Sequence, residues 1–393
     1  MEALETLFGK KKKLVIGLMS GTSADGIDAA LVEIHGSATS SKLRLIAFQT
    51  FLYPRGFKKF LLRNSSALTA RLDDVTRLDM LVATFFADAA KRLVRGAGLP
   101  MNRVDLIGSH GQTIHHLPIP RRMFGKNIRS TLQIGNTSAI AKLTGIVTVG
   151  DFRTGDLAVG GSGAPLVPLF DYLMLRSRTK NRAALNIGGI ANMTLLPRRC
   201  SIDDVIAFDT GPGNMVIDAL MQRFFDKPFD REGKIASRGK IDSRLLKWMA
   251  RHPYLGRNPP KSTGRELFGE NFLDRLLPRV HDANPLDLIT TATEFTALSI
   301  YQSYLKFIRA TSPLDELIVS GGGSHNRYLI DALRRYFSGV SVCPSDAMCI
   351  PSDAKEAICF ALLANETITG HSGNVPGSTG ARRRTILGVI ALP

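Results

Sequence analysis

The sequence predicts an α/β fold built from two similar halves, each with a mixed central sheet. The prediction rests on two glycine-rich loops about half a chain apart, one after the apolar run Leu14–Leu18 and one after Val205–Phe208. Each turn consists of small residues with hydroxyls and has an aspartate close by. One such loop is common, but two indicate a duplicated fold whose halves face each other across a nucleotide. Neither loop matches the Walker or the dinucleotide fingerprint, so its phosphate contacts would be of another kind.

The first half begins with three runs of β-forming residues separated by turns, a pattern that predicts an antiparallel three-stranded start. A longer stretch with apolar residues at helical spacing then ends at Gly98 and Pro100 and predicts a helix. In order, the expected elements are the strands Leu14–Leu18, Ile27–Ile34 and Leu43–Phe51, the helix Val75–Ala97, the short strand Val104–Ile107 ending at Ser109, the helix Ser138–Thr144 and the strand Ile146–Val149.

The same pattern restarts in the second half. In order, we expect the strands Ala183–Ile187, Met193–Leu196 and Val205–Phe208, the helix Met215–Phe225, the strand Leu317–Val319, the helix Arg327–Phe337, the strand Val340–Cys343 and the helix Ala354–Glu366. The segment Pro253–Gly264 is rich in Pro, Gly and Lys, and predicts a long functional loop. A chain of 393 residues exceeds what one hydrophobic core usually serves. We therefore expect two domains, one at 1–150 plus about 375–393 and the other at 151–374.

The formal net charge is +17, from 51 Lys and Arg against 34 Asp and Glu. Such an excess suits nucleic acid, an acidic surface or an anionic small substrate. The charge is scattered except at Lys10–Lys13, Arg121–Arg122 and Arg382–Arg384, and no aromatic residues interleave these clusters as in a single-strand binder. We expect no nucleic-acid partner, and interpret the charge as a solvated basic surface that helps to bind a nucleotide.

The cysteines and the apolar runs indicate an intracellular protein. The four cysteines are Cys200, Cys343, Cys349 and Cys359. None forms a CxxC pair and no His lies at a zinc spacing from them, so we expect reduced, mostly buried thiols and no metal site among them. No run reaches the ~18 apolar residues of a membrane span, and the N-terminus lacks the pattern of a secretory signal. We expect a cytoplasmic protein without a membrane partner; a short targeting extension before Lys13 stays open.

Small residues after strands favour phosphate chemistry, because backbone N–H groups can converge on an anion that no side chain blocks. Ser20, Thr22 and Ser23 add hydroxyls in the first loop. The second loop offers Thr210, Gly211 and Gly213, and a third candidate, Gly321–Gly323, lies between a strand and a helix. Each alone is more often an ordinary tight turn. All three in a duplicated pattern favour a nucleotide site.

Asp209 ends an apolar strand at the mouth of the second loop, where a carboxylate suits a cleft better than a core. It would act as a general base or hold Mg²⁺ through water, unless it only caps its own turn. His110 is either structural or a substrate contact, and His115 and His116 are expected on a loop as structural or solvated residues. Glu356 precedes an apolar run, a position typical of an acid at a helix N-terminus that the helix dipole favours.

Eight motifs in order resemble those of the anhydro-N-acetylmuramic acid kinase family and cover nearly the whole chain. They are Met19–Asp28 (MSGTSADGID), Gly108–Thr113 (GSHGQT), Asp151–Arg153 (DFR), Gly163–Pro168 (GAPLVP), Leu185–Gly189 (LNIGG), Phe208–Asn214 (FDTGPGN), Pro260–Glu266 (PKSTGRE) and Gly321–Gly323. The resemblance implies an actin/hexokinase/Hsp70-like fold, in which two RNase H-like halves close on ATP and Mg²⁺ in an interdomain cleft. That implication agrees with the duplication.

The resemblance also implies the chemistry. Water attacks C1 of a 1,6-anhydro sugar, the C1–O6 bond opens, and the released O6 takes the γ-phosphoryl group of ATP; the family match makes Asp209 the base. The implied ATP-binding residues are Gly21, Thr22, Ser23, Asp25, Gly26, Asp28, Thr210, Gly211, Gly213, Gly321, Gly322 and Gly323. The implied sugar-binding residues are His110, Arg153, Asn186 and Glu356.

Two departures from the family pattern leave the choice of sugar open. Ser162 replaces a Gln before Gly163, and Gly155 stands where bacterial members often carry a basic residue. A lost cation would weaken recognition of the lactyl carboxylate and leave room for a neutral sugar, as in the related levoglucosan kinases. A rival of another class is a non-catalytic, ATP-dependent clamp, which the presence of Asp209 disfavours. The sequence does not determine whether the chain forms a homodimer.

Overall fold

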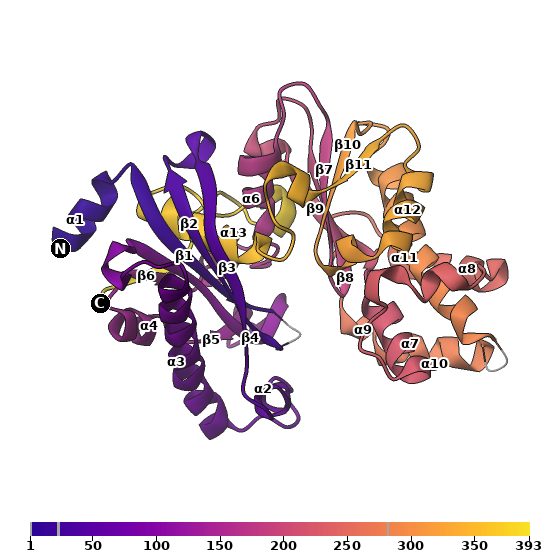
Figure 1. Ribbon diagram of the computed structural model, residues 1–393, viewed down its shortest axis with the longest axis horizontal. Coiled ribbons are helices and arrows are strands. Elements are labelled where there is room, and N and C mark those ends of the chain that lie inside the picture. The colour runs from indigo at the N-terminus through magenta and orange to yellow at the C-terminus, as the bar shows by residue number, and fades with distance from the viewer. Residues whose placement is uncertain (1, 22–23, 281–282) are drawn as a thin grey trace. The chain divides into compact units, whose positions relative to one another are not determined.

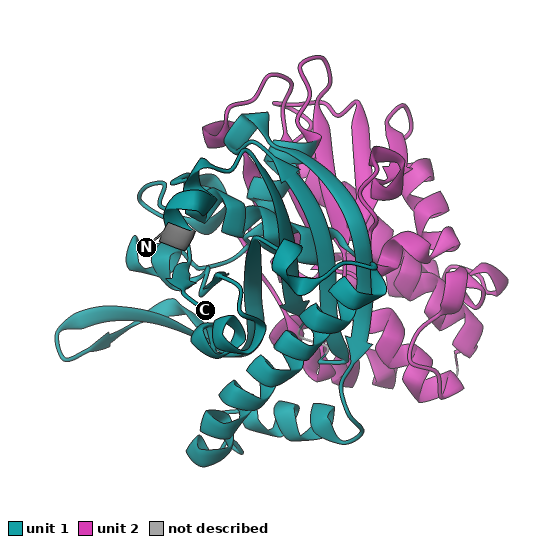
Figure 2. Cartoon of the chain, turned by 60° about the vertical axis from the view of Figure 1, so that its left-hand side comes forward, with its two compact units in different colours: residues 1–174, 354–393 teal, residues 175–353 magenta. Residues whose placement is uncertain are grey.

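The computed structural model describes residues 2–21, 24–280 and 283–393, and the chain divides into two compact units. Unit 1 comprises residues 1–174 and 354–393, and unit 2 comprises residues 175–353 (Figure 2). The sequence prediction assigned 151–174 and 354–374 to the second domain instead. The reason for the difference is close packing, since a Cβ on Gly17 would lie 1.8 Å from the Ala357 carbonyl oxygen and one on Gly108 would lie 2.1 Å from that of Phe360. These contacts fix the last long helix to the sheet of unit 1.

Unit 1 contains a sheet in the order β12-β6-β4-β1-β2-β3, with β5 paired to β4 (Figure 1). Its strands are β1 (Lys12–Ser20), β2 (Gly26–His35), β3 (Lys42–Leu52), β4 (Leu106–Met123), β5 (Lys126–Ile134), β6 (Thr148–Gly150) and β12 (Val389–Ala391). Its helices are α1 (Glu2–Gly9), α2 (Phe57–Asn64), α3 (Leu72–Gly96), α4 (Thr137–Thr144), α5 (Thr154–Ala158), α6 (Val167–Leu175), α13 (Lys355–Ile368) and α14 (Pro376–Thr379).

Unit 2 contains a sheet in the order β11-β10-β7-β8-β9. Its strands are β7 (Arg182–Ile187), β8 (Ile190–Leu196), β9 (Ile206–Pro212), β10 (Glu316–Ser320) and β11 (Ser341–Pro344). Its helices are α7 (Met215–Phe225), α8 (Ser243–Ala250), α9 (Arg265–Phe268), α10 (Glu270–Leu276), α11 (Pro285–Phe307) and α12 (Arg327–Tyr336).

The two sheets share one topology. In unit 1 the strands β1, β2 and β3 are antiparallel neighbours, and β4 and β6 join the sheet parallel to β1. In unit 2 the strands β7, β8 and β9 are antiparallel neighbours, and β10 and β11 follow parallel to β7. Each half is therefore an RNase H-like unit with a mixed sheet, which confirms the duplicated α/β fold.

The two glycine-rich loops are nevertheless not equivalent in this duplication. The first lies between β1 and β2, so its counterpart is the Gly188–Gly189 turn between β7 and β8. The second, at Thr210–Asn214, ends β9 and leads into α7. The duplication is real, but it is carried by the strand order and not by the likeness of the two loops.

Two elements differ from the sequence prediction for clear physical reasons. The strand β4 does not stop near Ser109 but runs to Met123, because it forms a hairpin in which His115 faces Leu132 and His116 faces Thr131. The prediction of a loop at these histidines was wrong. The helix α11 was missed because every residue from Leu288 to Ala297 is buried, so its sequence lacks an apolar stripe at helical spacing.

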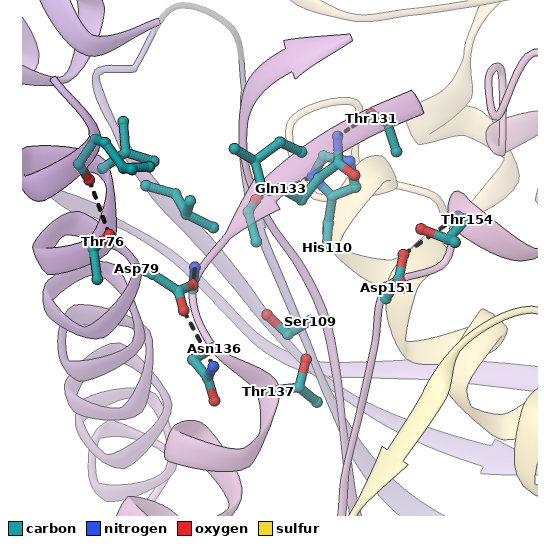
Figure 3. A pocket seen from close by; sticks show the side chains of 16 residues that line it. Thr76, Asp79, Ser109, His110, Thr131, Gln133, Asn136, Thr137, Asp151 and Thr154 are labelled. Carbon is teal, nitrogen blue, oxygen red and sulfur yellow. Dashed lines mark hydrogen bonds between the residues drawn. The ribbon is translucent and has the colours of Figure 1, made fainter. Parts of the chain in front are cut away.

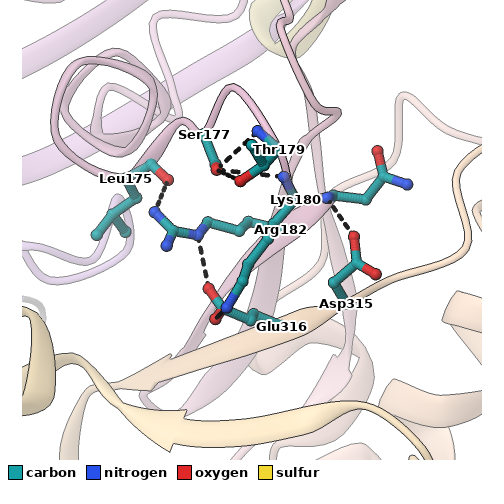
Figure 4. Close-up of polar contacts among 8 residues, drawn as sticks. Leu175, Ser177, Thr179, Lys180, Arg182, Asp315 and Glu316 are labelled. Carbon is teal, nitrogen blue, oxygen red and sulfur yellow. Dashed lines mark hydrogen bonds and ion pairs between the residues drawn. The ribbon is translucent and has the colours of Figure 1, made fainter.

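A polar network closes the edge of unit 2 where β7 begins (Figure 4). Arg182 Nε donates to Glu316 Oε2 at 2.7 Å, and Lys180 pairs with the other carboxylate oxygen. Arg182 Nη1 also donates to the Leu175 carbonyl at 2.9 Å. Burial acts to raise the pKa of Glu316, but these two cations hold it below its ordinary value. The ionised carboxylate thus fixes β7 beside β10.

None of the described helices is long and apolar enough to cross a membrane.

Candidate active site

A row of polar residues crosses the sheet of unit 2 near the end of its strands. Ser320 on β10 pairs with Asn186 on β7, Asn186 pairs with Asn192 on β8, and Asn192 pairs with Asp209 on β9. Residues paired across neighbouring strands share a face of the sheet. The register therefore gathers Asn186 and Asp209, both predicted from the sequence, beside Asn192 and Ser320, which were not.

Asp209 is a half-buried carboxylate within β9, which continues past it to Pro212, so the prediction that Asp209 ends its strand was wrong. Its Oδ2 accepts the Thr263 N–H at 2.9 Å, and its carbonyl accepts the Tyr254 hydroxyl at 2.8 Å. Burial is the main reason why the pKa of Asp209 is raised to about 6, and the nearby charge of Glu266 raises this pKa further. The hydrogen bond from the Thr263 N–H and the positive charge of Lys261 both lower it. A carboxyl with such a pKa suits a base that works near neutral pH.

The second glycine loop is held by backbone contacts. A Cβ on Gly213 would lie 2.2 Å from the Gly188 carbonyl oxygen, so only glycine fits there. The Gly213 N–H donates to the Gly189 carbonyl at 2.9 Å, which joins the two turns. The Thr210 hydroxyl is buried and donates to the Ala191 carbonyl at 3.1 Å. Thr210 therefore presents only its backbone to a ligand.

A pocket of about 520 Å³ lies next to the third glycine loop in unit 2. Its lining residues are Asn214, Ile217, Asp218, Phe229, Asp230, Arg231, Glu232, Gly322, His325 and Asn326. Burial raises the pKa of Asp218 to about 7, and Phe229 is half exposed. Gly321 has φ 79° and packs where a Cβ would lie 2.6 Å from Asn186 Oδ1, so this loop must be glycine to lie against β7.

Gln112 on β4 forms hydrogen bonds to Ser20 and Gly21, at the start of the first glycine loop. Ser20 Oγ lies 2.6 Å from Gln112 Oε1, and Gln112 Nε2 donates to the Gly21 carbonyl at 3.2 Å. Gly26 begins β2 where a Cβ would lie 2.6 Å from the Phe51 carbonyl oxygen. Two predicted residues of this loop, Thr22 and Ser23, lie outside the described residues.

The two aspartates of this segment have different surroundings. The Asp25 side chain is mostly exposed and pairs with Lys58 at 2.6 Å. Asp28 accepts the Thr50 hydroxyl at 2.6 Å, and its negative charge raises the pKa of Glu356. Asp28 thus belongs to the polar cluster of unit 1 described next, whereas Asp25 lies at the surface.

His110 and Arg153 form a pair in unit 1, in which His110 is buried and Arg153 is half-buried. Arg153 Nε donates to His110 Nε2 at 3.0 Å, and Arg153 Nη1 donates to the Gly163 carbonyl at 2.9 Å. Because His110 Nε2 accepts, its Nδ1 carries the proton and donates to the Gly111 carbonyl at 3.0 Å. Burial, reinforced by the charge of Arg153, lowers the pKa of His110 to about 3. The pair therefore combines a neutral imidazole with a fixed cation.

Glu356 lies in the first turn of α13 and completes this cluster. Burial and the charge of Asp28 raise its pKa, while Lys355 and Arg153 oppose the shift. Lys355 forms a buried ion pair with Asp171 of α6 at 2.7 Å, with only 3% of each side chain exposed. This ion pair fixes the start of α13, and with it the position of Glu356.

A pocket of about 530 Å³ lies in unit 1 on the side of α3 (Figure 3). Asp79 of α3 accepts the Gly135 N–H at 2.9 Å and the Asn136 side-chain amide at 3.1 Å, which fixes the rim. His110 and Asp151 also line the pocket. His110, one member of the pair with Arg153, therefore borders this space.

Ser162 and Gly155, the two departures from the family pattern, both lie against residues of the C-terminal segment. Ser162 Oγ lies 3.0 Å from the Thr379 carbonyl oxygen, and the Ser162 N–H donates to the same oxygen at 2.8 Å. A Cβ on Gly155 would lie 3.3 Å from the Leu387 side chain. Both residues therefore have packing roles within unit 1.

The sequence missed Asn192 and Asp218. Asn192 follows the LNIGG motif by a few residues, and only strand register shows that it faces Asp209. Asp218 had one available signal, a carboxylate on the first turn of the helix after the second loop. Among the residues that the structure describes, no group of three or more His, Cys, Asp and Glu side chains is placed to hold a metal ion.

Duplicated RNase H-like sheets define an actin-like ATPase fold, and glycine loops beside the Asp209 carboxylate fit an enzyme of that fold that acts on a nucleotide. The chain belongs to the anhydro-N-acetylmuramic acid kinase family, whose family model matches residues 13–393. It is 46% identical over 395 residues to the anhydro-N-acetylmuramic acid kinase of Salinibacter ruber, covering 100% of both chains. It is 44% identical over 396 residues to that of Caldanaerobacter subterraneus subsp. tengcongensis, again covering 100% of both.

Among solved structures, the activator of 2-hydroxyisocaproyl-CoA dehydratase from Clostridium difficile with bound ADPNP is similar at 12% identity and a TM-score of 0.45, covering 90% of this chain and 95% of that one.

Proposed function

We propose that this kinase opens the 1,6-anhydro ring of anhydro-N-acetylmuramic acid with water and transfers the γ-phosphoryl group of ATP to O6. The products are N-acetylmuramic acid 6-phosphate and ADP, as expected for the recycling of cell-wall fragments in the cytoplasm. The observation that carries the proposal is Asp209, a half-buried carboxylate of β9 beside the second glycine loop, whose raised pKa of about 6 suits a base for water. The names of the 46% and 44% identical relatives support the choice of sugar.

In this mechanism Asp209 takes a proton from the water that attacks C1. The C1–O6 bond breaks, and its electron pair stays on O6, which attacks the γ-phosphorus of ATP. The β–γ bridge then breaks and ADP leaves. Because Asp209 must be ionised to act, activity rises with pH through about 6.

The cluster of unit 1 is assigned to the sugar. Arg153 is held by His110 and the Gly163 carbonyl, so its guanidinium stays in one place and would pair with the lactyl carboxylate. Neutral His110 and Glu356 would contact sugar hydroxyls or the acetamido group. A fixed cation binds a carboxylate more tightly than a mobile one because it loses little conformational freedom on binding.

The pocket beside Gly322 is assigned to the nucleoside of ATP. Its volume of about 520 Å³ is in the range of small-molecule sites. Phe229 offers an exposed ring on which a base can stack, and Asp218 offers a carboxylate to ribose hydroxyls. Mg²⁺ would arrive with the ATP phosphates as part of the substrate.

The decisive experiment measures ADP release by the wild-type protein with ATP and Mg²⁺, using anhydro-N-acetylmuramic acid and levoglucosan in parallel. We expect turnover of the first sugar, with the 6-phosphate identified by ³¹P and ¹³C NMR. Turnover of levoglucosan alone would reject the proposed substrate. ATP binding without turnover of either sugar would favour the non-catalytic clamp.

Replacing Asp218 by Asn tests the nucleoside pocket. The neutral amide keeps the size of the side chain but accepts ribose hydroxyls less strongly, so we expect the KM for ATP to rise about tenfold with little change in kcat. Steady-state kinetics with varied ATP measure this. The control is Asp226→Asn at the C-terminal end of α7, where Asn tolerates the left-handed backbone of φ 50°. Equal KM values for both variants would remove Asp218 from the site.

A further inference from the structure

Lys261 has unusual surroundings for a cation. Only 9% of the residue is exposed, and its Nζ is a buried atom without a hydrogen-bond partner among the described residues. Instead, Nζ lies 4.8 Å from the ring centroids of Tyr254 and Phe307 and 5.7 Å from that of Phe208. These three rings form an aromatic cage. Such rings stabilise an ammonium through their negative faces.

The aromatic cage is built next to the candidate base. Phe208 directly precedes Asp209 on β9. The Tyr254 hydroxyl donates to the Asp209 carbonyl at 2.8 Å, so one wall of the cage is bonded to the Asp209 backbone. Burying a cation without a hydrogen-bond acceptor costs folding free energy unless a nearby anion offsets that cost. The carboxylate of Asp209 is the negative charge that acts on Lys261.

The same segment also holds the Asp209 carboxylate. The Asp209 N–H donates to the Lys261 carbonyl at 3.1 Å, and the Thr263 N–H donates to Asp209 Oδ2 at 2.9 Å. If Lys261 left its cage, the backbone on either side of it would lose its place, and Thr263 would move with it. The cage therefore supports both the position and the charge state of the carboxylate.

We propose that Lys261 is a positioning residue for the reaction: its caged ammonium docks the 254–264 loop on β9 and keeps the Asp209 carboxylate ionised and in place. The inference rests on the proposed function for its kinetic consequence. It goes beyond that function by giving a residue that need not touch the substrate a defined part in activating the base.

The charged groups around this pair determine the expected direction. Burial and Glu266 raise the pKa of Asp209, while the Thr263 N–H and Lys261 lower it. Burial and Lys306 lower the pKa of Lys261 to about 8, and Asp209 opposes this. Lys261 therefore stays largely protonated at pH 6 to 7, where Asp209 titrates. Removing its charge must raise the pKa of Asp209.

The test compares Lys261→Met with Lys261→Arg across pH 5 to 9. Methionine keeps an unbranched side chain in the cage but has no charge. For K261M we expect the acid limb of the kcat/KM profile to move to higher pH, with most activity recovered at pH 8.5. For K261R, which keeps the charge and can stack on the rings, we expect the wild-type midpoint.

The matched control is Lys306→Met. Lys306 Nζ lies 5.2 Å from the centroid of the same Phe307 ring, but it is outside the cage and donates to the Gly256 carbonyl. We expect its acid limb to stay at the wild-type midpoint. The proposal would be overturned if the acid limb of the kcat/KM profile did not move in K261M, or if it moved equally in K306M. If K261M does not fold, a displaced midpoint in folded K261R overturns it equally.

A second readout needs no substrate. The carboxyl of Asp209 is titrated by ¹³C NMR in protein labelled at the aspartate side chain, with the resonance assigned by its loss in D209N. We expect the midpoint of Asp209 to be higher in K261M than in the wild type. An unchanged midpoint contradicts the role of Lys261 even if no sugar is turned over. An inactive wild type with a shifted K261M midpoint rejects only the proposed function.

Discussion

Asp209→Asn is expected to reduce kcat by about 10³–10⁴-fold while nucleotide binding is retained. The amide has the same size and still accepts the Thr263 N–H, so the local geometry is preserved. It cannot take a proton from water, so attack on C1 loses its base. Calorimetric titration with a non-hydrolysable ATP analogue measures the retained binding, and ADP release measures the lost turnover.

The control for this prediction is Asp203→Asn, an exposed aspartate in the turn before β9. It should keep wild-type kcat. A wild-type rate in D209N would remove Asp209 from the role of base, and a loss of ATP binding would show that its main part is structural.

The stability of D209N provides an internal check that it is folded. The folded pKa of Asp209, about 6, lies above the value of 3.8 for a free aspartate. The folded state therefore binds more protons than the unfolded state between these values, and stability falls as pH rises through this window. Asparagine carries no charge to bury, so D209N should melt at a higher temperature than the wild type at pH 8. Such a gain on removing a functional group is typical of active sites.

Most of the fold could be predicted from the sequence because its signals are local. Runs such as Ile27–Ile34 contain enough β-forming residues to define strands, and Met215–Phe225 shows helical periodicity that matches α7. The order of strands in each sheet is not local. For that reason the first glycine loop was matched to Thr210–Asn214, although its equivalent is the Gly188–Gly189 turn.

The candidate site shows the same division. Asp209 was predicted because it follows an apolar run at the mouth of a glycine loop, and Asn186 because the resemblance to the family implied it. The role of Asn192 depends on strand register, which one sequence does not determine. The aromatic cage of Lys261 is even harder to predict from the sequence, because it combines Phe208 with Tyr254 and Phe307 from distant segments.

Lys355→Met is expected to lower the free energy of unfolding by about 3–5 kcal/mol, because it leaves Asp171 buried without its cation. The two side chains are each 3% exposed and 2.7 Å apart, so little solvent is available to replace the lost partner. Chemical denaturation followed by circular dichroism measures the change. The exposed Lys59 of unit 1 provides the control, since Lys59→Met should change stability by no more than about 0.5 kcal/mol.

The double variant Lys355→Met with Asp171→Leu separates the cost of an unpaired charge from the loss of a contact. With both charges gone and apolar side chains in their place, most of the stability should return. If the double variant is as unstable as the single one, the ion pair itself holds α13, and simple packing does not replace it. Either result bears on the proposed sugar site, because Glu356 lies one residue after Lys355. A double variant that is stable but has a raised KM for the sugar would show that the pair is kept to place Glu356.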